Sequence, residues 1–362
     1  MDEMEKSLTA PEMKTLIKTP LKARVVNAVF WLGITKIFGQ AISWFITIYV
    51  ARILLPDDYG LLSMSGVFIG LILLFNEVGL GAAIIQRETI TREDLSNIFW
   101  VVILLNAALY LISYMLAPFI AVFFNEPRIV PIMRVIAVNF IISGIGLVPY
   151  QMLSRELSFR KRSVAEFIGN LSGGIATLLF ALKGAGVWSL VYGGVTVAAV
   201  TNFLYCVFYP WMPMFSFSPS KIKGMLNFGA KVAGARLMWY TYSNSDYLIA
   251  GKLLGKAALG YYTIAFQFAS VPLEKIVSLY TQVAFPAFSE IQNDPERLKK
   301  YFLKSVNFIA FITFPLFMLL FLTSEDAVNS LLTPKWGPIV LPLKILCVVS
   351  TLRAINALNI PI

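Results

Sequence analysis

Long apolar runs separated by short polar segments follow one another along the whole chain. Each run has about 20 residues or more, the length that a helix needs to cross roughly 30 Å of hydrocarbon. Because an open strand would leave backbone groups unpaired in lipid, each run is predicted to be a helix, in an all-α polytopic membrane protein. The ten predicted spans are 26–53, 61–86, 97–124, 129–153, 163–182, 185–209, 226–250, 258–286, 302–323 and 337–361.

The polar positions between and within these runs show an internal repeat with a shift of 200 residues. The segment ARILLPDDYGLLSMSGVF aligns without a gap with a later segment, GKLLGKAALGYYTIAFQF. Six predicted spans separate the copies, so both have the same orientation and are expected to be related by an axis along the membrane normal. Five matched pairs keep their chemical character: Arg52 with Lys252, Leu54 with Leu254, Gly60 with Gly260, Ser63 with Thr263, and Phe68 with Phe268.

The same shift superimposes two polar stripes in the spans that precede these segments. The stripe residues recur at i, i+4, i+7 and i+11, a spacing that places each set on one face of a helix. They are Lys36, Gln40, Ser43 and Thr47 in the first copy, and Arg236, Tyr240, Ser243 and Tyr247 in the second.

The repeat predicts four regions: a cytoplasmic amphipathic tail at 1–25, a six-span lobe at 26–209, a cytoplasmic linker at 210–225 and a four-span lobe at 226–362. A disordered tail is the alternative for the first region. Since a complete second copy would end near residue 409, which is 209 plus the shift of 200, we expect a longer parent protein with at least two more spans.

Composition and charge agree with a membrane protein and give it an orientation. The chain is 58% hydrophobic and 14% charged, a balance that soluble domains of 362 residues do not normally reach. Its net charge of +10 arises mainly from Lys and Arg in the tail and in alternate connections. The positive-inside rule therefore predicts a multi-pass protein of the cytoplasmic membrane with its N-terminus in the cytoplasm. Because these charges are used for orientation, no basic face remains for nucleic acid.

Enzymatic chemistry has little support in the sequence. The chain has no histidine, which excludes catalysis by a Ser–His–Asp triad and any histidine-ligated metal. No GxxxxGK segment is present to hold nucleotide phosphates. We therefore expect a protein that is not an enzyme and that needs no cofactor or metal.

Charged residues inside the predicted spans are candidate functional residues, because an uncompensated charge is costly in hydrocarbon. Arg and Lys bind phosphate oxygens, so Lys36 and Arg236 are predicted to face each other across the repeat axis and to bind a lipid diphosphate. The full set of predicted binding residues, with polar partners for sugar hydroxyls, is Lys36, Gln40, Ser43, Arg236, Tyr240, Ser243 and Lys275. Structural ion pairs, such as Lys36 with Glu77, are the alternative.

The resemblance to a known family rests on five segments spread over most of the chain: ARILLPDDYGLLS, VGLGAAIIQRE, LSRELSFRKRS, SDYLIAGKLLGKAALGYYTIA and FPAFSEIQNDPERLKKYF. With these, the sequence resembles the polysaccharide-exporting branch of the multidrug/oligosaccharidyl-lipid/polysaccharide exporter superfamily. The resemblance implies two six-helix lobes around a central cavity and alternating access. It also implies a polyprenyl-diphosphate-linked oligosaccharide as substrate and polysaccharide polymerase machinery as a partner.

Three alternatives stay open at this point. A multidrug exporter of the same fold, coupled to sodium or protons, would need a carboxylate, and Glu77, Asp246 and Glu274 are the candidates for it. A membrane-embedded glycosyltransferase or polymerase would need acidic groups in a large outer loop, whereas the predicted outer loops are short. A structural scaffold would not need paired cations within its spans.

Overall fold

The structure is a computed structural model that describes residues 39–40, 42–75, 84, 90–156, 158–214, 236–290 and 294–356. These residues are helical apart from short connections, and no strand occurs among them. The predicted tail at 1–25 lies outside the described residues.

Six helices are long and apolar enough to cross a membrane within the described part of the chain. Four of them belong to the first copy: α5 (Arg92–Phe124), α6 (Ile129–Arg155), α7 (Phe159–Leu182) and α8 (Val187–Phe208). Two belong to the second copy: α11 (Pro295–Leu322), and a 3-10 turn (Pro334–Ile339) that continues into α13 (Val340–Asn356). They confirm the predicted spans that begin at 97, 129, 163, 185, 302 and 337.

Most of the remaining described helices lie where the two copies contact each other. A helix over Ile42–Ile53 precedes α3 (Pro56–Leu73), and a helix at 236–243 precedes α10 (Ser245–Glu290). The short α12 (Ser324–Leu331) connects α11 to the 3-10 turn. α3 begins five residues before the apolar run at 61–86, because Pro56 opens the helix and two aspartates complete its first turn, where the helix dipole favours acidic residues.

Both copies break their helices at matched positions. Leu55, with φ −90° and ψ 156°, is extended and separates the helix over Ile42–Ile53 from α3. In the second copy the break is at Gly255, where φ is 82° and ψ is 179°. Only glycine adopts such a backbone readily, so α10 consists of a segment that ends before Gly255 and a longer segment after it. The predicted turn between spans 226–250 and 258–286 is confirmed.

Local sequence sets the ends of the long helices. Thr91 caps α5 by accepting a hydrogen bond from the Asp94 backbone N–H at 3.2 Å, while the Asp94 carboxylate accepts one from the Thr91 N–H. The Asp294 carboxylate caps α11 by accepting a hydrogen bond from the Arg297 backbone N–H at 3.1 Å, with Pro295 in the first turn. Such caps replace partners that the first turn of a helix lacks. The two capped helices begin at 92 and 295, close to the 200-residue shift.

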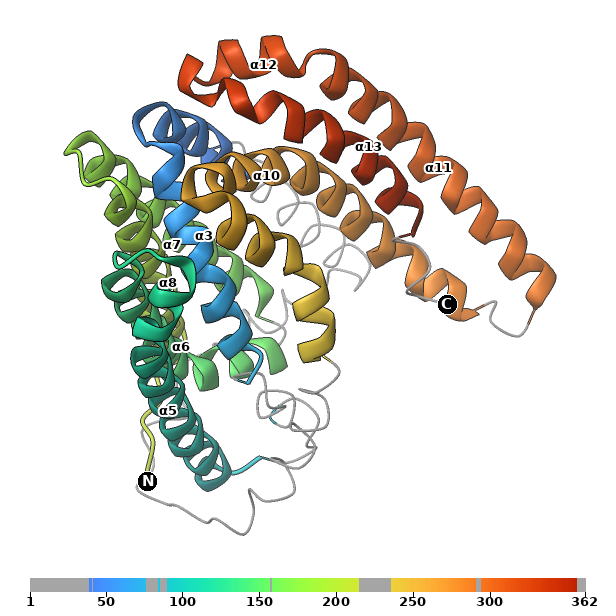
Figure 1. The fold of residues 1–362 in the computed structure, drawn as a ribbon. Coiled ribbons are helices and arrows are strands. Elements are labelled where there is room, and N and C mark those ends of the chain that lie inside the picture. The colour runs from blue at the N-terminus through green and yellow to red at the C-terminus, as the bar shows by residue number, and fades with distance from the viewer. Residues whose placement is uncertain are drawn as a thin grey trace.

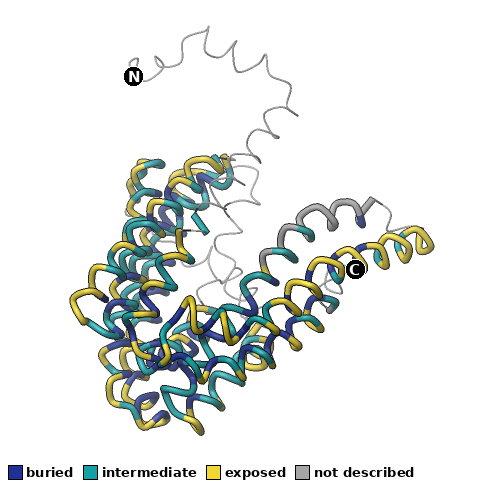
Figure 2. The backbone as a smooth tube through the Cα atoms, turned by 90° about the horizontal axis from the view of Figure 1, so that it is seen from above, coloured by how far each residue is buried: buried dark blue, intermediate teal, exposed yellow. Residues whose placement is uncertain are grey.

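The helices form two lobes that meet at one end and diverge toward the other (Figures 1 and 2). In the first lobe α7 packs along α8, α5 along α6, and α6 against α8. In the second lobe α13 packs against both α10 and α11. α3 lies along α10 and thus connects the lobes.

The start of the linker at 210–225 is folded against the first lobe. The Trp100 indole donates a hydrogen bond to the Met214 carbonyl at 3.0 Å, and the Met214 N–H donates one to the Ser96 hydroxyl at 2.9 Å. The Trp211 ring lies 5.5 Å from the Phe99 ring. Residues 210–214 therefore run across the beginning of α5.

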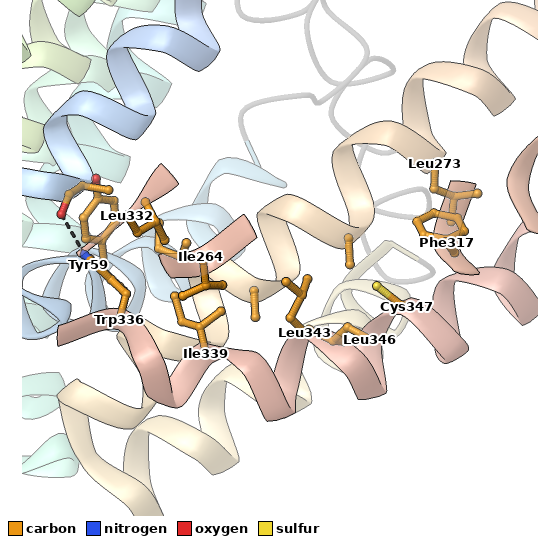
Figure 3. Packing of buried hydrophobic residues seen from close by; sticks show 14 of the residues in the cluster. Tyr59, Ile264, Leu273, Phe317, Leu332, Trp336, Ile339, Leu343, Leu346 and Cys347 are labelled. Atoms are coloured by element: carbon orange, nitrogen blue, oxygen red, sulfur yellow. Dashed lines mark hydrogen bonds between the residues drawn. The ribbon is translucent and has the colours of Figure 1, made fainter. Parts of the chain in front are cut away.

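A hydrophobic core fills the end where the lobes meet, and it contains side chains of both copies (Figure 3). Trp336 is completely buried there, and its indole nitrogen donates a hydrogen bond to the Ala51 carbonyl at 2.8 Å. Two tyrosine rings, one from each copy, lie near the Trp336 ring: Tyr59 at 5.5 Å and Tyr261 at 6.0 Å. One tryptophan of the second lobe thus holds the helix over Ile42–Ile53 of the first.

The 200-residue repeat is also present in the packing. The hydroxyls of Ser63 and Thr263, a matched pair, lie 2.8 Å apart. A Cβ on Gly60 would lie 1.8 Å from the Lys256 carbonyl oxygen, and a Cβ on Gly260 would lie 1.9 Å from that of residue 56. Since residue 56 and Lys256 are themselves matched, the two contacts are exchanged by a local twofold axis, as in an isologous interface.

Candidate functional site

Three of the predicted site residues lie wholly or partly outside the described part of the chain. Lys36 and Glu77 are outside the described residues. Lys275 belongs to α10, but its side chain is also outside the described part. The predicted Lys36–Glu77 ion pair and the proposed pairing of Lys36 with Arg236 across the axis stay predictions.

The described part of the first stripe lies on the helix that precedes α3. Gln40 is half-buried and Ser43 is exposed. On the same helix, the Trp44 ring lies 5.1 Å from the Phe268 ring of α10 in the second lobe. This helix of the first copy therefore borders the second copy, as a stripe on the lobe interface would require.

The second stripe lies on the helix at 236–243 and continues into α10. Arg236 is exposed and Ser243 is half-buried. The Tyr240 hydroxyl donates a hydrogen bond to the Val67 carbonyl of α3 at 2.8 Å, next to Gly70. The predicted sugar-binding role of Tyr240 is untested, but its hydroxyl already has a partner in the other copy. Tyr240 thus fixes its helix against α3.

Two of the predicted coupling carboxylates belong to the second lobe. The Tyr262 hydroxyl donates a hydrogen bond to the Asp246 carboxylate, which also accepts one from the Tyr247 N–H at 2.9 Å. Glu274 is exposed on α10. The Arg353 guanidinium lies 5.6 Å from the Phe266 ring, one turn of α10 beyond Tyr262. Asp246 is therefore a half-buried carboxylate bound by the Tyr262 phenol, and Arg353 is a cation of the same lobe.

An ion-pair cluster at the end where the lobes meet was not predicted from the sequence. The Lys256 Nζ lies 2.6 Å from a Glu126 carboxylate oxygen and 3.7 Å from an Asp57 oxygen. The Arg128 Nε lies 2.8 Å from the other Glu126 oxygen. The Arg128 hydrogen bond, and after it that of Lys256, lowers the Glu126 pKa to about 2 against desolvation, which acts in the opposite direction. The only sequence signal was the position of these residues in predicted outer turns.

No group of three or more His, Cys, Asp or Glu side chains within the described residues is arranged to hold a metal. The described residues show instead two helices that each contact the other copy, through Trp44 and Tyr240, one half-buried carboxylate in the second lobe, and an ion-pair cluster where the lobes meet.

A family model described as polysaccharide biosynthesis protein matches residues 49–341, which is most of the chain. The chain belongs to this polysaccharide biosynthesis family. The match includes both copies of the repeat and all of α3 to α12, so the family resemblance read from the sequence is confirmed.

Curated relatives of this family member have names that concern polysaccharide assembly. The chain is 30% identical to the teichuronic acid biosynthesis protein TuaB of Bacillus subtilis over 77% of its length, and 27% identical to the lipopolysaccharide biosynthesis protein WzxC of Escherichia coli over 93%. It is 24% identical over 86% to the succinoglycan biosynthesis transport protein ExoT of Rhizobium meliloti. The chain spans 58% of the length of TuaB, 69% of WzxC and 63% of ExoT.

Solved structures of similar fold are transporters. The lipid II flippase MurJ in an inward closed conformation has a TM-score of 0.67 at 14% identity, covering 91% of this chain and 76% of MurJ. A multidrug MATE transporter in an inward-facing conformation has a TM-score of 0.61 at 17% identity, covering 89% and 83%. The polysaccharide biosynthesis family member therefore has the predicted all-α, two-lobed fold, which it shares with these two transporters.

Proposed function

We propose that the protein moves a polyprenyl-diphosphate-linked oligosaccharide across the cytoplasmic membrane by alternating access, for polysaccharide export. The observation that carries the proposal is the pair of repeat-related lobes, which contact each other at one end and diverge at the other (Figure 2). Two lobes that meet about a twofold axis can open first one end and then the other. The names of the relatives give the class of cargo, since they concern polysaccharide assembly and its transport.

The proposed cargo site is formed by the two stripes. Lys36 and Arg236 supply positive charge for the diphosphate, while Gln40, Ser43 and Ser243 supply hydrogen bonds for sugar hydroxyls. Their helices border the lobe interface, which supports this assignment. Tyr240 contributes by holding its helix on α3, and Lys275 is kept as a further cation.

The orientation proposed for the protein has the N-terminus and the basic connections in the cytoplasm. The lobes then meet at the outer face, because residues 51–57 and 251–257 follow odd-numbered spans. The diverging ends face the cytoplasm, where lipid-linked sugars for export enter. Polymerase machinery that extends the sugar would receive the cargo on the outer side.

Removal of one stripe cation tests the function. Lys36→Gln and Arg236→Gln, each in the full-length protein, are expected to abolish glycan export in a strain that lacks its own flippase, because the diphosphate loses its counter-charge. Melting temperatures in detergent should stay near those of the parent. Lys183→Gln, which removes an exposed cation from a connection between α7 and α8, is the matched control and should export normally.

The outcomes separate the proposed site from its alternative. Normal export by both variants would contradict the cargo site. Lost export together with a stability loss of about 3 to 5 kcal/mol would indicate structural ion pairs instead, because removing one partner leaves the other charge uncompensated within the membrane.

A cation-coupled multidrug exporter is a second candidate, favoured by the Asp246–Tyr262 pair and by the fold shared with a MATE transporter. Asp246 is half-buried and already accepts a hydrogen bond from the Tyr262 phenol, so a coupling cation bound there would replace that phenol as a partner of the carboxylate. Asp246, with Glu77 and Glu274, is the proposed coupling group in either function. The cargo distinguishes them: drug resistance without glycan export would favour the second candidate.

A further inference from the structure

The end where the lobes meet, here called the junction, consists of residues 50–63, 123–128, 250–263 and 330–336. Two cations of the junction bind the ends of helices in the opposite lobe. The Arg52 guanidinium donates to the Leu331 carbonyl at 2.8 Å and to the Ser330 carbonyl at 2.6 Å, at the end of α12. The Lys252 ammonium donates to the Phe123 carbonyl, at the end of α5.

The chemistry of these contacts is that of helix C-termini. The last carbonyls of a helix have no partner within the helix and carry the negative end of its dipole. A cation placed there satisfies them and is itself stabilised. Arg52 contacts two carbonyls with its planar fork, whereas Lys252 contacts one as a point charge.

Arg52 and Lys252 are matched by the 200-residue shift, and each reaches from its own copy into the other. Arg52 belongs to the first copy and binds the second lobe, while Lys252 belongs to the second copy and binds the first lobe. The two donors are therefore related by the same twofold axis that relates Gly60 to Gly260. Their acceptors are not matched, because Phe123 would correspond to residue 323, whereas Arg52 binds residues 330 and 331 at the end of α12. The two arms thus share an origin in the repeat and cross between the lobes in opposite directions.

Further contacts close the junction around these arms. The Lys335 ammonium donates to the Arg52 carbonyl at 2.8 Å, so the end of the helix over Ile42–Ile53 is bound in return. Lys256 pairs with Glu126 at 2.6 Å on the other side of the axis. Between them the helices cross so closely at Gly60 and Gly260 that a Cβ would overlap a backbone oxygen.

We propose that Arg52 and Lys252 are the two arms of a latch that holds the junction shut, and that both release their helix ends when the junction opens. Both side chains are exposed, so water can solvate the ammonium, the guanidinium and the carbonyls once they separate. The latch is therefore reversible, unlike a buried ion pair, whose charges would be costly to separate. The role of the latch, to close one end of a transporter, rests on the proposed function. The experiment below measures only how far the junction is exposed, so it can fail independently of transport.

The test uses a reporter cysteine at the centre of the junction. Cys206→Ala and Cys347→Ala first remove the two cysteines of the 362-residue chain. Ser63→Cys then introduces the reporter, which is labelled with a membrane-impermeant maleimide. Arg52→Gln and Lys252→Gln are expected to raise the labelling rate by roughly ten-fold each, the effect of losing a charge-assisted hydrogen bond on an equilibrium. The double variant should label faster than either, and Lys183→Gln should label like the parent.

A steric pair of variants examines the same closure without changing charge. Gly60→Ala is expected to raise labelling, because its Cβ would lie 1.8 Å from a backbone oxygen of the other copy. Gly66→Ala is the control on the same helix, since no atom lies within 4 Å of its Cβ position. A double charge variant that labels at the rate of Lys183→Gln would overturn the latch.

A disulfide between the two copies reports the same closure, and it can be used if a charge variant folds poorly. Ser63→Cys with Thr263→Cys should form a disulfide under mild oxidation, because the two hydroxyls lie 2.8 Å apart in the closed junction. Arg52→Lys, which retains a cation but loses the fork, should reduce the crosslinked fraction in proportion to the time the junction spends open. An unchanged fraction in Arg52→Lys and in Lys252→Gln would contradict the proposal, whatever the transport activity of these proteins.

Discussion

Single residues at the junction gain their properties from partners far away in the sequence. The Glu126 carboxylate lies beside Arg128 of the same turn, and the fold also brings Lys256, 130 residues later, within 2.6 Å of it. Arg128 holds the other oxygen, and only 13% of the Glu126 side chain is exposed. The pKa of Glu126 is therefore lowered first by its neighbour Arg128 and then by Lys256, which only the assembled lobes bring into contact with it.

This pKa predicts how stability depends on pH. The folded pKa of about 2 lies below the ordinary value of 4.5, so the stabilisation from ionised Glu126 is complete above pH 4.5 and is lost as the pH falls toward 2. The melting temperature of the detergent-solubilised protein should thus fall more steeply between about pH 5 and pH 3 than that of Glu126→Gln. Parallel curves for the two proteins would show that the carboxylate is not stabilised by its partners.

Between helices, small residues decide how closely two elements approach. α7 and α8 pack against each other through Gly169 and Gly173 of α7, which form the small-xxx-small spacing used in membrane helix contacts. A Cβ on Gly173 would lie 2.2 Å from a Val197 methyl and 2.8 Å from the Gly193 carbonyl oxygen. The second neighbour is backbone, which cannot rotate away.

Gly173→Ala is therefore expected to destabilise the first lobe by about 1 to 3 kcal/mol, the usual cost of overpacking. Gly194→Ala on α8 is the matched control, because its Cβ would meet no atom within 4 Å. Thermal unfolding of both variants in the same detergent measures the difference. Equal melting temperatures would mean that α7 and α8 are less closely packed than the structure shows.

The arrangement of the whole molecule in the membrane follows from the distribution of its charges. Arg160, at the start of α7, is exposed in one of the basic connections that are predicted to be cytoplasmic. In intact cells, Arg160→Cys in the cysteine-free protein should be protected from an impermeant maleimide and should become reactive after the cells are permeabilised. A cysteine at Leu253, in the opposite turn, is the control that should react from outside. Labelling of position 160 in intact cells would reverse the proposed orientation.

Much of this architecture is readable in the chain itself, because lipid imposes it locally. A helix of about 20 apolar residues is required wherever the backbone crosses hydrocarbon, so apolar run length alone locates the six spans that the structure confirms. The match of Gly60 with Gly260 and of Ser63 with Thr263 likewise indicates the repeat. In the structure Ser63 contacts Thr263 across its axis, and each glycine packs against the backbone of the other copy.

The contacts between copies were decided only by the tertiary structure. Tyr240 reads as a sugar ligand in a helical stripe, yet its hydroxyl binds the Val67 carbonyl, 173 residues away. Arg52 and Lys252 read as markers of a repeat, and no local pattern shows that each binds a helix end in the other lobe. The physical reason is range: apolar periodicity and charge act within one helix or one membrane crossing, whereas the partner of a polar side chain depends on how whole lobes are placed.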